Sequence, residues 1–208
     1  LKLLTNGKVI FDCHENNTAY IKQKEYLPNA LRWILYYGMF FLEILAAKIL
    51  DAIITADAGV TKLYETRYGA KKVVLLHNFP RLDLFVIPDV APPQNYQLVY
   101  HGTIPKYHLE VTFNVAEELK KRGILVDWLF FGSCIYKDWA EAEMKKRNLT
   151  NIHLDNKRIP HEEVAARVMQ AQIGFIPLPD LPKFQHNIPT KLFEFMALRM
   201  PTILSDLP

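Results

Sequence analysis

The chain has 208 residues, half of them hydrophobic, so it is long enough for one large or two small domains with a substantial core. Its formal net charge of +3 fits a phosphorylated ligand or an anionic membrane surface, but it is too small to indicate nucleic-acid binding. The two cysteines, Cys13 and Cys134, lie far apart and lack the spacing of a metal site. These features favour a reduced, cytoplasmic protein without a bound metal.

The first part of the sequence alternates predicted strands with predicted helices. The expected strands are 8–13, 51–56 and 72–76, and the expected helices are 26–50 and 58–68. This order implies a parallel sheet. His14 and Glu15 follow the first strand directly, at the end of a strand where open α/β sheets place ligand contacts. A plain loop is the alternative interpretation of this pair.

Residues 26–50 form a long apolar helix candidate. A membrane span needs roughly 20 apolar residues with few charges, and Arg32, Glu43 and Lys48 interrupt this stretch. We therefore expect a buried helix, packed in a core or an interface that a missing part of the fold completes, and no insertion into a bilayer. The alternative is peripheral contact with a membrane surface, because aromatic residues favour the interface. The aromatic residues of this stretch are Trp33, Tyr36, Tyr37, Phe40 and Phe41.

A proline-rich stretch at 81–95 predicts a linker between a first domain at 1–80 and a second domain at 96–208. In the second domain, strands are expected at 97–101, 125–131, 151–155, 173–177 and 202–205, and helices at 108–122, 136–147, 161–170 and 189–199. This regular alternation predicts an α/β fold with a doubly wound sheet in each Rossmann-like domain.

The segment 187–206 has the most informative pattern. Pro189 suits the start of a helix, and Asn187 or Thr190 is a candidate cap. Lys191 and Glu194 are three residues apart and share one face of the first turn. The pair alone favours a surface ion pair of little energetic value. The alternative is a nucleotide site, in which the helix N-terminus and the lysine attract a diphosphate and the carboxylate accepts ribose hydroxyls.

The sequence PTKLFEFMALRMPTILSD, from 189 to 206, resembles the donor-site segment of glycosyltransferase family 4, whose members have the two-domain GT-B fold. The resemblance implies that Glu194 holds the ribose of a nucleotide sugar. The family often has a second glutamate eight positions earlier, in contact with the donor sugar, and here His186 stands at that place. The resemblance also implies retention of the anomeric configuration without a bound metal.

The same resemblance suggests further site residues in three loops. Gly102 begins a loop in which the family has an arginine and a lysine for the diphosphate; Thr103 takes the arginine's place, and Lys106 is a possible substitute. Gly132 resembles the glycine beneath the nucleotide base, although a strand-to-helix turn explains it equally well. His14 matches a family histidine near the donor sugar or acceptor and is the candidate catalytic residue.

The resemblance implies a glycosyltransferase with a nucleotide-diphosphate sugar as donor and a glycan or lipid-linked acceptor in glycan or polysaccharide biosynthesis. We expect a cytoplasmic protein, with peripheral contact at the inner face of the membrane as the alternative. We also expect a GT-B fold that is incomplete at both ends. Two alternatives remain. A nucleotide-sugar epimerase of similar fold needs no acceptor, and a non-catalytic nucleotide-binding or scaffold protein is favoured by Thr103 and His186.

Overall fold

The computed structural model describes residues 7–14, 16–22, 24, 27–69, 72–87, 94–181, 184 and 188–207. The chain divides into two compact units. The first contains the chain up to Asn78, and the second contains Phe79–Pro179 and Pro189–Leu207. Each unit is a parallel sheet with helices, and each is described by itself below.

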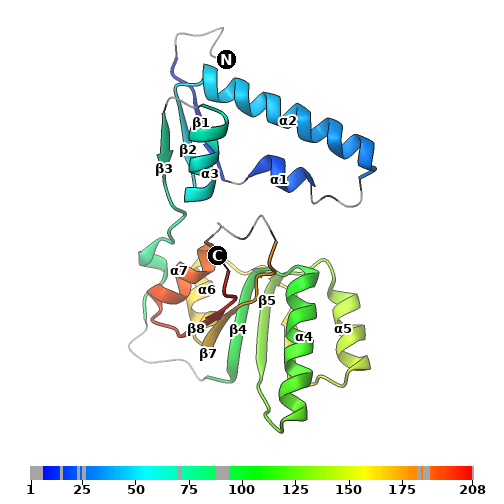
Figure 1. The fold of residues 1–208 in the computed structure, drawn as a ribbon. Coiled ribbons are helices and arrows are strands. Elements are labelled where there is room, and N and C mark those ends of the chain that lie inside the picture. Colours follow the sequence, from blue (N-terminus) through cyan, green and yellow to red (C-terminus); the bar gives the residue numbers. More distant parts are fainter. Residues whose placement is uncertain are drawn as a thin grey trace. The chain divides into compact units, whose positions relative to one another are not determined.

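The first unit has a three-stranded parallel sheet in the order β1 (Ile10–Cys13), β2 (Ala52–Thr55), β3 (Val73–Leu75), as Figure 1 shows. Its helices are α1 (Asn17–Lys22), α2 (Asn29–Ile49) and α3 (Ala58–Lys62), which continues into the π-helical turn η1 (Leu63–Arg67). The sequence analysis missed α1, which has only six residues, and predicted α3 and η1 as one regular helix.

Residues 29–49 form the expected helix, but most of its surface is exposed among the described residues, so the expected burial stays a prediction. Helix α2 buries only Tyr36, Glu43 and Ala47. In the part of the chain that the structure describes, it is the one helix long and apolar enough to cross a membrane. Its exposed large apolar residues are Leu31, Trp33, Ile34, Leu35, Tyr37, Phe41, Leu42, Leu45 and Ile49.

The buried face of α2 is attached to its own unit through Glu43. The carboxylate of Glu43 accepts hydrogen bonds from Tyr68 at 2.5 Å, from Tyr64 at 3.3 Å and from Asn17 at 3.1 Å. Burial raises the pKa of both tyrosines, so they remain protonated donors. The carboxylate that interrupts the apolar pattern therefore fixes the face of α2 that packs toward α1 and η1.

The second unit has a five-stranded parallel sheet in the order β6-β5-β4-β7-β8 (Figure 1). Its strands are β4 (Tyr96–Thr103), β5 (Trp128–Ser133), β6 (Ile152–Asp155), β7 (Ala171–Ile176) and β8 (Thr202–Leu204). Its helices are η2 (Leu82–Leu84), α4 (Lys106–Lys121), α5 (Lys137–Lys146), α6 (His161–Val168) and α7 (Thr190–Ala197). This is the predicted doubly wound α/β architecture.

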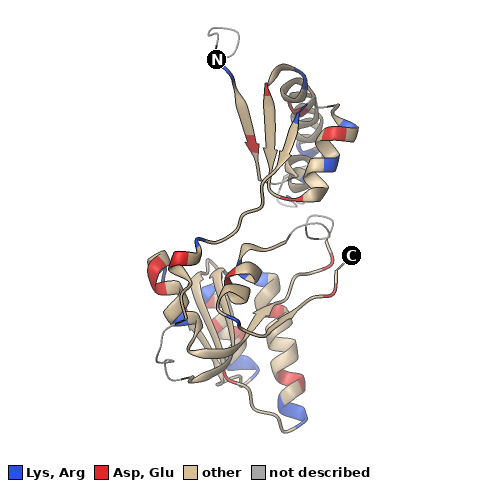
Figure 2. Cartoon of the chain, turned by 90° about the vertical axis from the view of Figure 1, so that its left-hand side faces the viewer, with Lys and Arg blue, Asp and Glu red and all other residues tan. Residues whose placement is uncertain are grey.

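The two faces of this sheet have separate cores. Apolar residues of α4 and α5 pack on one face, and those of α6 and α7 pack on the other. Phe85, which the sequence analysis assigned to the linker, is buried in the second of these cores. Figure 2 shows that the strands carry almost no charged residues; Asp12 in β1 and Asp155 in β6 are the exceptions. Uncharged, buried strands such as β4 and β5 are typical of parallel sheets covered on both faces.

The direction of chain connection changes beside β4, the central strand. The chain runs outward from β4 through β5 to β6, then returns to the other side of β4 and continues through β7 to β8. In open α/β sheets, ligands bind outside the carboxyl ends of the strands at such a switch point. The carboxyl end of β4 is His101, Gly102 and Thr103, and Gly102 and Thr103 are among the predicted site residues.

Candidate functional site

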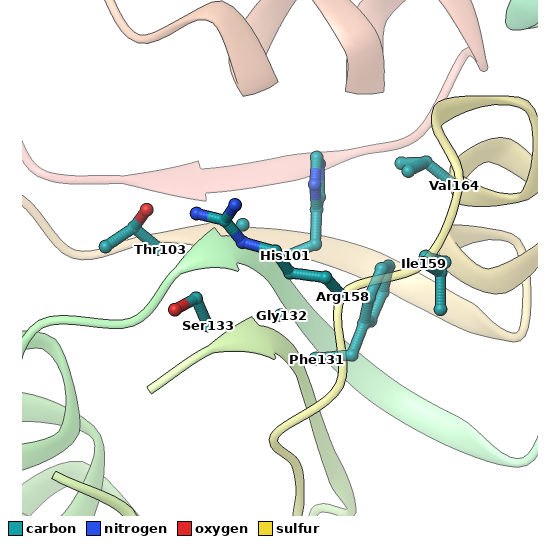
Figure 3. A pocket seen from close by; sticks show the side chains of 9 residues that line it. His101, Thr103, Phe131, Gly132, Ser133, Arg158, Ile159 and Val164 are labelled. Atoms are coloured by element: carbon teal, nitrogen blue, oxygen red, sulfur yellow. The ribbon is translucent and has the colours of Figure 1, made fainter. Parts of the chain in front are cut away.

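A cavity of about 250 Å³ lies at the carboxyl ends of β4 and β5. This is slightly below the roughly 300–1,000 Å³ usual for small-molecule sites, and it suits a nucleoside-sized group. Figure 3 shows the side chains around it. The lining residues are His101, Gly102, Thr103, Phe131, Gly132, Ser133, Arg158, Ile159 and Val164. The structure thus brings together three predicted site residues, Gly102, Thr103 and Gly132.

The two glycines of the cavity serve different purposes. A side chain on Gly132 would meet the carbonyl oxygen of Gly102 at 2.1 Å, and Gly132 has a φ of +129°, so only glycine fits there. Gly102 has a φ of +98°, and nothing lies within 4 Å of the position a Cβ would take. Gly132 therefore lets β5 approach β4, whereas Gly102 leaves backbone open to a ligand.

Arg158 is a lining residue that the sequence analysis missed. It is exposed and lies in the loop between β6 and α6, and Figure 3 shows its side chain extending toward Thr103. Asn156 anchors the same loop, because its Oδ1 accepts a hydrogen bond of 2.7 Å from the backbone N–H of Cys134. A basic residue just after a parallel strand was the signal that could have identified Arg158.

Glu194 on α7 is almost fully buried, and its carboxylate contacts His101. The distance from His101 Nε2 to Glu194 Oε2 is 3.0 Å. The distance is that of a hydrogen bond, although the ring N–H is not well aligned with the oxygen. The ring of His101 stacks on Phe131 and meets Phe195 edge-on, with centroid distances of 5.5 and 5.4 Å. These contacts hold the His101 side chain in the core, between β5 and α7.

Burial and mutual contact determine the charges of this pair. Burial lowers the pKa of His101, although Glu194 acts in the opposite direction. Burial raises the pKa of Glu194, but contacts with His101 and His161 outweigh it and hold the pKa below its ordinary value. At neutral pH the site therefore holds a carboxylate next to a neutral imidazole.

His161, the first residue of α6, contacts the other oxygen of the same carboxylate. Its Nε2 lies 3.5 Å from Glu194 Oε1, and its side chain is 50% exposed. The ring also packs edge-on against Phe85, with a centroid distance of 5.4 Å. The sequence analysis used His161 only as the start of a helix, and its role beside Glu194 depends on a contact between distant elements.

Lys191 reaches the loop after β4 through a tyrosine. Its Nζ donates a hydrogen bond of 3.2 Å to the hydroxyl of Tyr100 and lies 4.6 Å from the centre of that ring. The Tyr100 hydroxyl in turn donates to the backbone oxygen of Thr103 at 2.9 Å. Burial lowers the pKa of Lys191 to about 8, although Glu194 acts in the opposite direction. The lysine is thus placed directly behind the loop predicted to hold a diphosphate.

These contacts contradict the interpretation of Lys191 and Glu194 as a surface ion pair. Glu194 is buried and contacts two histidines, whereas Lys191 bonds to Tyr100. Among the described residues the two side chains form no direct ion pair. Their positions on one turn of α7 instead direct a carboxylate and an ammonium toward the end of β4.

Lys106 lies away from the cavity. It is the first residue of α4, its Nζ lies 3.6 Å from Glu110 Oε1, and it also lies 4.7 Å from the centre of the Trp139 ring. Both partners belong to the α4–α5 side of the sheet. In the structure Lys106 therefore contacts Glu110 and Trp139, whereas the sequence analysis placed it beside a diphosphate.

His14 lies in the first unit, at the carboxyl end of β1. Its Nε2 is 3.1 Å from Asp12 Oδ2 and its Nδ1 is 3.1 Å from Asn78 Nδ2. Asp12 and His14 are both more than half exposed. The structure thus places His14 at the ligand end of its own sheet, with a partner for each ring nitrogen.

The remaining predicted positions are His186 and Asn187, which lie outside the described residues. Helix α7 begins at Thr190, after Pro189, and Thr190 does not cap it with its side chain. Among the described residues, no group of three or more His, Cys, Asp or Glu side chains is arranged to hold a metal ion.

The similarity of this chain to known proteins lies in its structure. No protein-family model matches the sequence, and no curated protein matches it. Sucrose-phosphate synthase from Thermosynechococcus elongatus aligns with a TM-score of 0.70 and 16% identity, over 99% of this chain and 52% of that chain. HepE from Anabaena, in complex with UDP and glucose, aligns with a TM-score of 0.65 and 10% identity, over 99% and 55%.

The α,α-trehalose-phosphate synthase (UDP-forming) from Burkholderia vietnamiensis aligns with a TM-score of 0.62 and 12% identity, over 98% of this chain and 53% of that chain. The chain therefore spans about half the length of these structures. All three are GT-B glycosyltransferases. At such low identity the likeness shows the fold, and the chain has the fold of part of a GT-B glycosyltransferase.

Proposed function

We propose that the chain is part of a glycosyltransferase that moves a sugar from a nucleoside diphosphate donor to an acceptor, with retention of configuration. The observation that carries this proposal is the placement of Glu194 and Lys191. One turn of α7 directs a carboxylate and an ammonium toward the end of β4, beside the cavity at the switch point of the sheet. The GT-B fold, and the UDP held by HepE, support the proposal.

Each group of the site has a role in this proposal. Glu194 accepts hydrogen bonds from ribose hydroxyls, and Gly102 gives the nucleotide access to backbone. Lys191 and the N-terminus of α7 attract the diphosphate. Arg158 adds a cation at the cavity, where Thr103 stands in place of the family's arginine.

The chemistry proposed for the site is positioning and electrostatic stabilisation. When the bond between sugar and diphosphate breaks, negative charge grows on the departing diphosphate. A fixed ammonium close to that charge lowers the barrier, because it is already oriented and partly shielded from water. We propose that this stabilisation requires no metal ion.

The first unit would supply the contacts of the sugar and the acceptor. We propose that His14 contacts the donor sugar or the acceptor, and that the acceptor is a glycan or a lipid-linked molecule in glycan or polysaccharide biosynthesis. Because both ring nitrogens have partners in the structure, a sugar or acceptor hydroxyl would have to replace Asp12 or Asn78 to bond His14. We place the protein in the cytoplasm, with the exposed aromatic side chains of α2 in peripheral contact with the inner membrane face.

A thermal-shift experiment with the purified chain tests whether it binds nucleotides. The panel contains UDP, ADP and GDP, with UMP and uridine as matched ligands that lack one or both phosphates. We expect one diphosphate to raise the melting temperature more than its monophosphate and nucleoside do, because only binding to the folded state stabilises it. If every diphosphate in the panel leaves the melting temperature unchanged at millimolar concentration, the proposal fails.

A further inference from the structure

The carboxylate proposed to bind ribose is covered in this structure. The side chain of Glu194 is only 9% exposed, and Glu194 is not among the described residues that line the cavity. His101 lines the cavity and contacts one carboxylate oxygen, and His161 contacts the other. A ribose can therefore reach Glu194 only if one of the two histidines moves.

The surroundings of the two histidines decide which one can move. His101 is 8% exposed at its side chain, lies inside a strand, and is held between Phe131 and Phe195. His161 is 50% exposed, and its longer distance of 3.5 Å to the carboxylate indicates a weaker contact. Displacing His161 moves one half-exposed side chain, whereas displacing His101 disrupts the core.

We propose that His161 occupies Oε1 of Glu194 in the unliganded chain and that the ribose of the nucleotide displaces it. His101 stays in place and orients the carboxylate through Oε2. This inference rests on the proposed function and adds regulation of the same site: His161 competes with the nucleotide for one carboxylate oxygen. The affinity for the nucleotide then reflects how much more strongly Glu194 interacts with ribose than with His161.

The other contact of His161 does not oppose its displacement. Its ring packs edge-on against Phe85 beside η2, and this apolar contact competes for neither oxygen of Glu194. The charged residues near η2, Arg81 and Asp83, pair with each other.

The test is calorimetric titration of UDP into the wild-type chain and two variants of His161. His161→Ala removes the competitor, and His161→Phe removes it while keeping an aromatic ring against Phe85. We expect both variants to bind UDP about two- to fivefold more tightly, the range of a half-exposed ion pair.

His153→Ala is the matched control, because His153 is an exposed histidine on β6 whose ring packs on Tyr96. It should leave UDP affinity unchanged. If both His161 variants bind UDP as the wild type does or more weakly, while Glu194→Ala still weakens binding, this inference is wrong and the proposed function stands. If the wild-type chain binds no UDP or other nucleoside diphosphate, the proposed function fails and the inference with it.

Discussion

Lys191 shows how much the surroundings of a single residue decide its role. In the sequence it is a lysine in the first turn of a helix, where a solvated ion pair is the ordinary outcome. In the structure its ammonium lies against the ring and hydroxyl of Tyr100, directly behind Thr103. Burial lowers its pKa to about 8. A bound diphosphate would raise this pKa again, because a nearby negative charge stabilises the ammonium.

Replacing Lys191 by alanine should weaken binding of a nucleoside diphosphate about tenfold or more, the usual effect of losing a hydrogen bond to a charged group. The matching nucleoside has no phosphate, so its affinity should change little. In the wild-type chain the preference for the diphosphate should decrease as pH rises through and above about 8, because the ammonium is lost. Calorimetry with UDP and uridine over this pH range measures both effects.

Lys106→Ala is the matched control for this variant, because Lys106 is a lysine near the same sheet end whose partners are Glu110 and Trp139. It should weaken UDP binding much less than Lys191→Ala does. Equal weakening of UDP and uridine by Lys191→Ala would show that the lysine only shapes the loop through Tyr100. Unchanged binding of both would remove Lys191 from the site.

The strands and α-helices of the second unit could be predicted because each has a clear local signal, whereas η2 lies in the stretch predicted as a linker. The predicted strand 202–205 and helix 161–170 appear as Thr202–Leu204 and His161–Val168. Helix α7 packs closely on β7, where a side chain on Gly174 would meet the ring of Phe195 at 2.4 Å. That requirement for glycine comes from tertiary packing, and no local pattern indicates it.

The side chains around Glu194 could not be predicted in the same way. Glu194 itself was found through the resemblance of its segment, but His101 and His161 come from β4 and α6 and meet it only in the folded sheet. The role of Lys106 was predicted from its place in a loop, whereas α4 begins at Lys106 and directs it to Glu110. The spacing of residues along the chain predicts where helices and strands lie, but it does not predict which partner a long side chain reaches.

The packing of helix α2 is another feature that the sequence does not predict. Its apolar residues occur on every face, so the sequence does not indicate which face packs. The structure fixes that face through the hydrogen bonds of Glu43 with Tyr64, Tyr68 and Asn17. If α2 spanned a bilayer, these bonds would be lost and the carboxylate would enter the hydrocarbon at high cost.

We therefore expect α2 to remain on its own unit in the presence of membranes. In sedimentation with anionic vesicles, raising the salt concentration should release most of the bound protein. Salt screens the attraction between basic residues and anionic lipid, and the aromatic side chains of α2 alone hold a peripheral protein only weakly. Neutral vesicles are the control and should retain less protein. Tight retention at high salt on either vesicle type would contradict peripheral contact and indicate insertion.

At the level of the whole molecule, the chain combines two parallel α/β units and spans about half the length of the GT-B structures that it resembles. The described residues of the proposed nucleotide site, which are those of the cavity together with Glu194 and Lys191, all belong to the second unit. Nucleotide binding is therefore a property that the chain can show without turnover, and it can be measured directly.

Calorimetric titration of the tightest-binding nucleoside diphosphate into the wild-type chain and Glu194→Ala measures the contribution of the central residue. We predict a loss of about 1.5–3 kcal/mol of binding free energy, the range for hydrogen bonds to a charged group. The variant's circular dichroism should match that of the wild type, so that the loss reports the site and not the fold. Unchanged affinity in a folded Glu194→Ala variant would contradict the assignment of Glu194 to the ribose and the nucleotide site built around it.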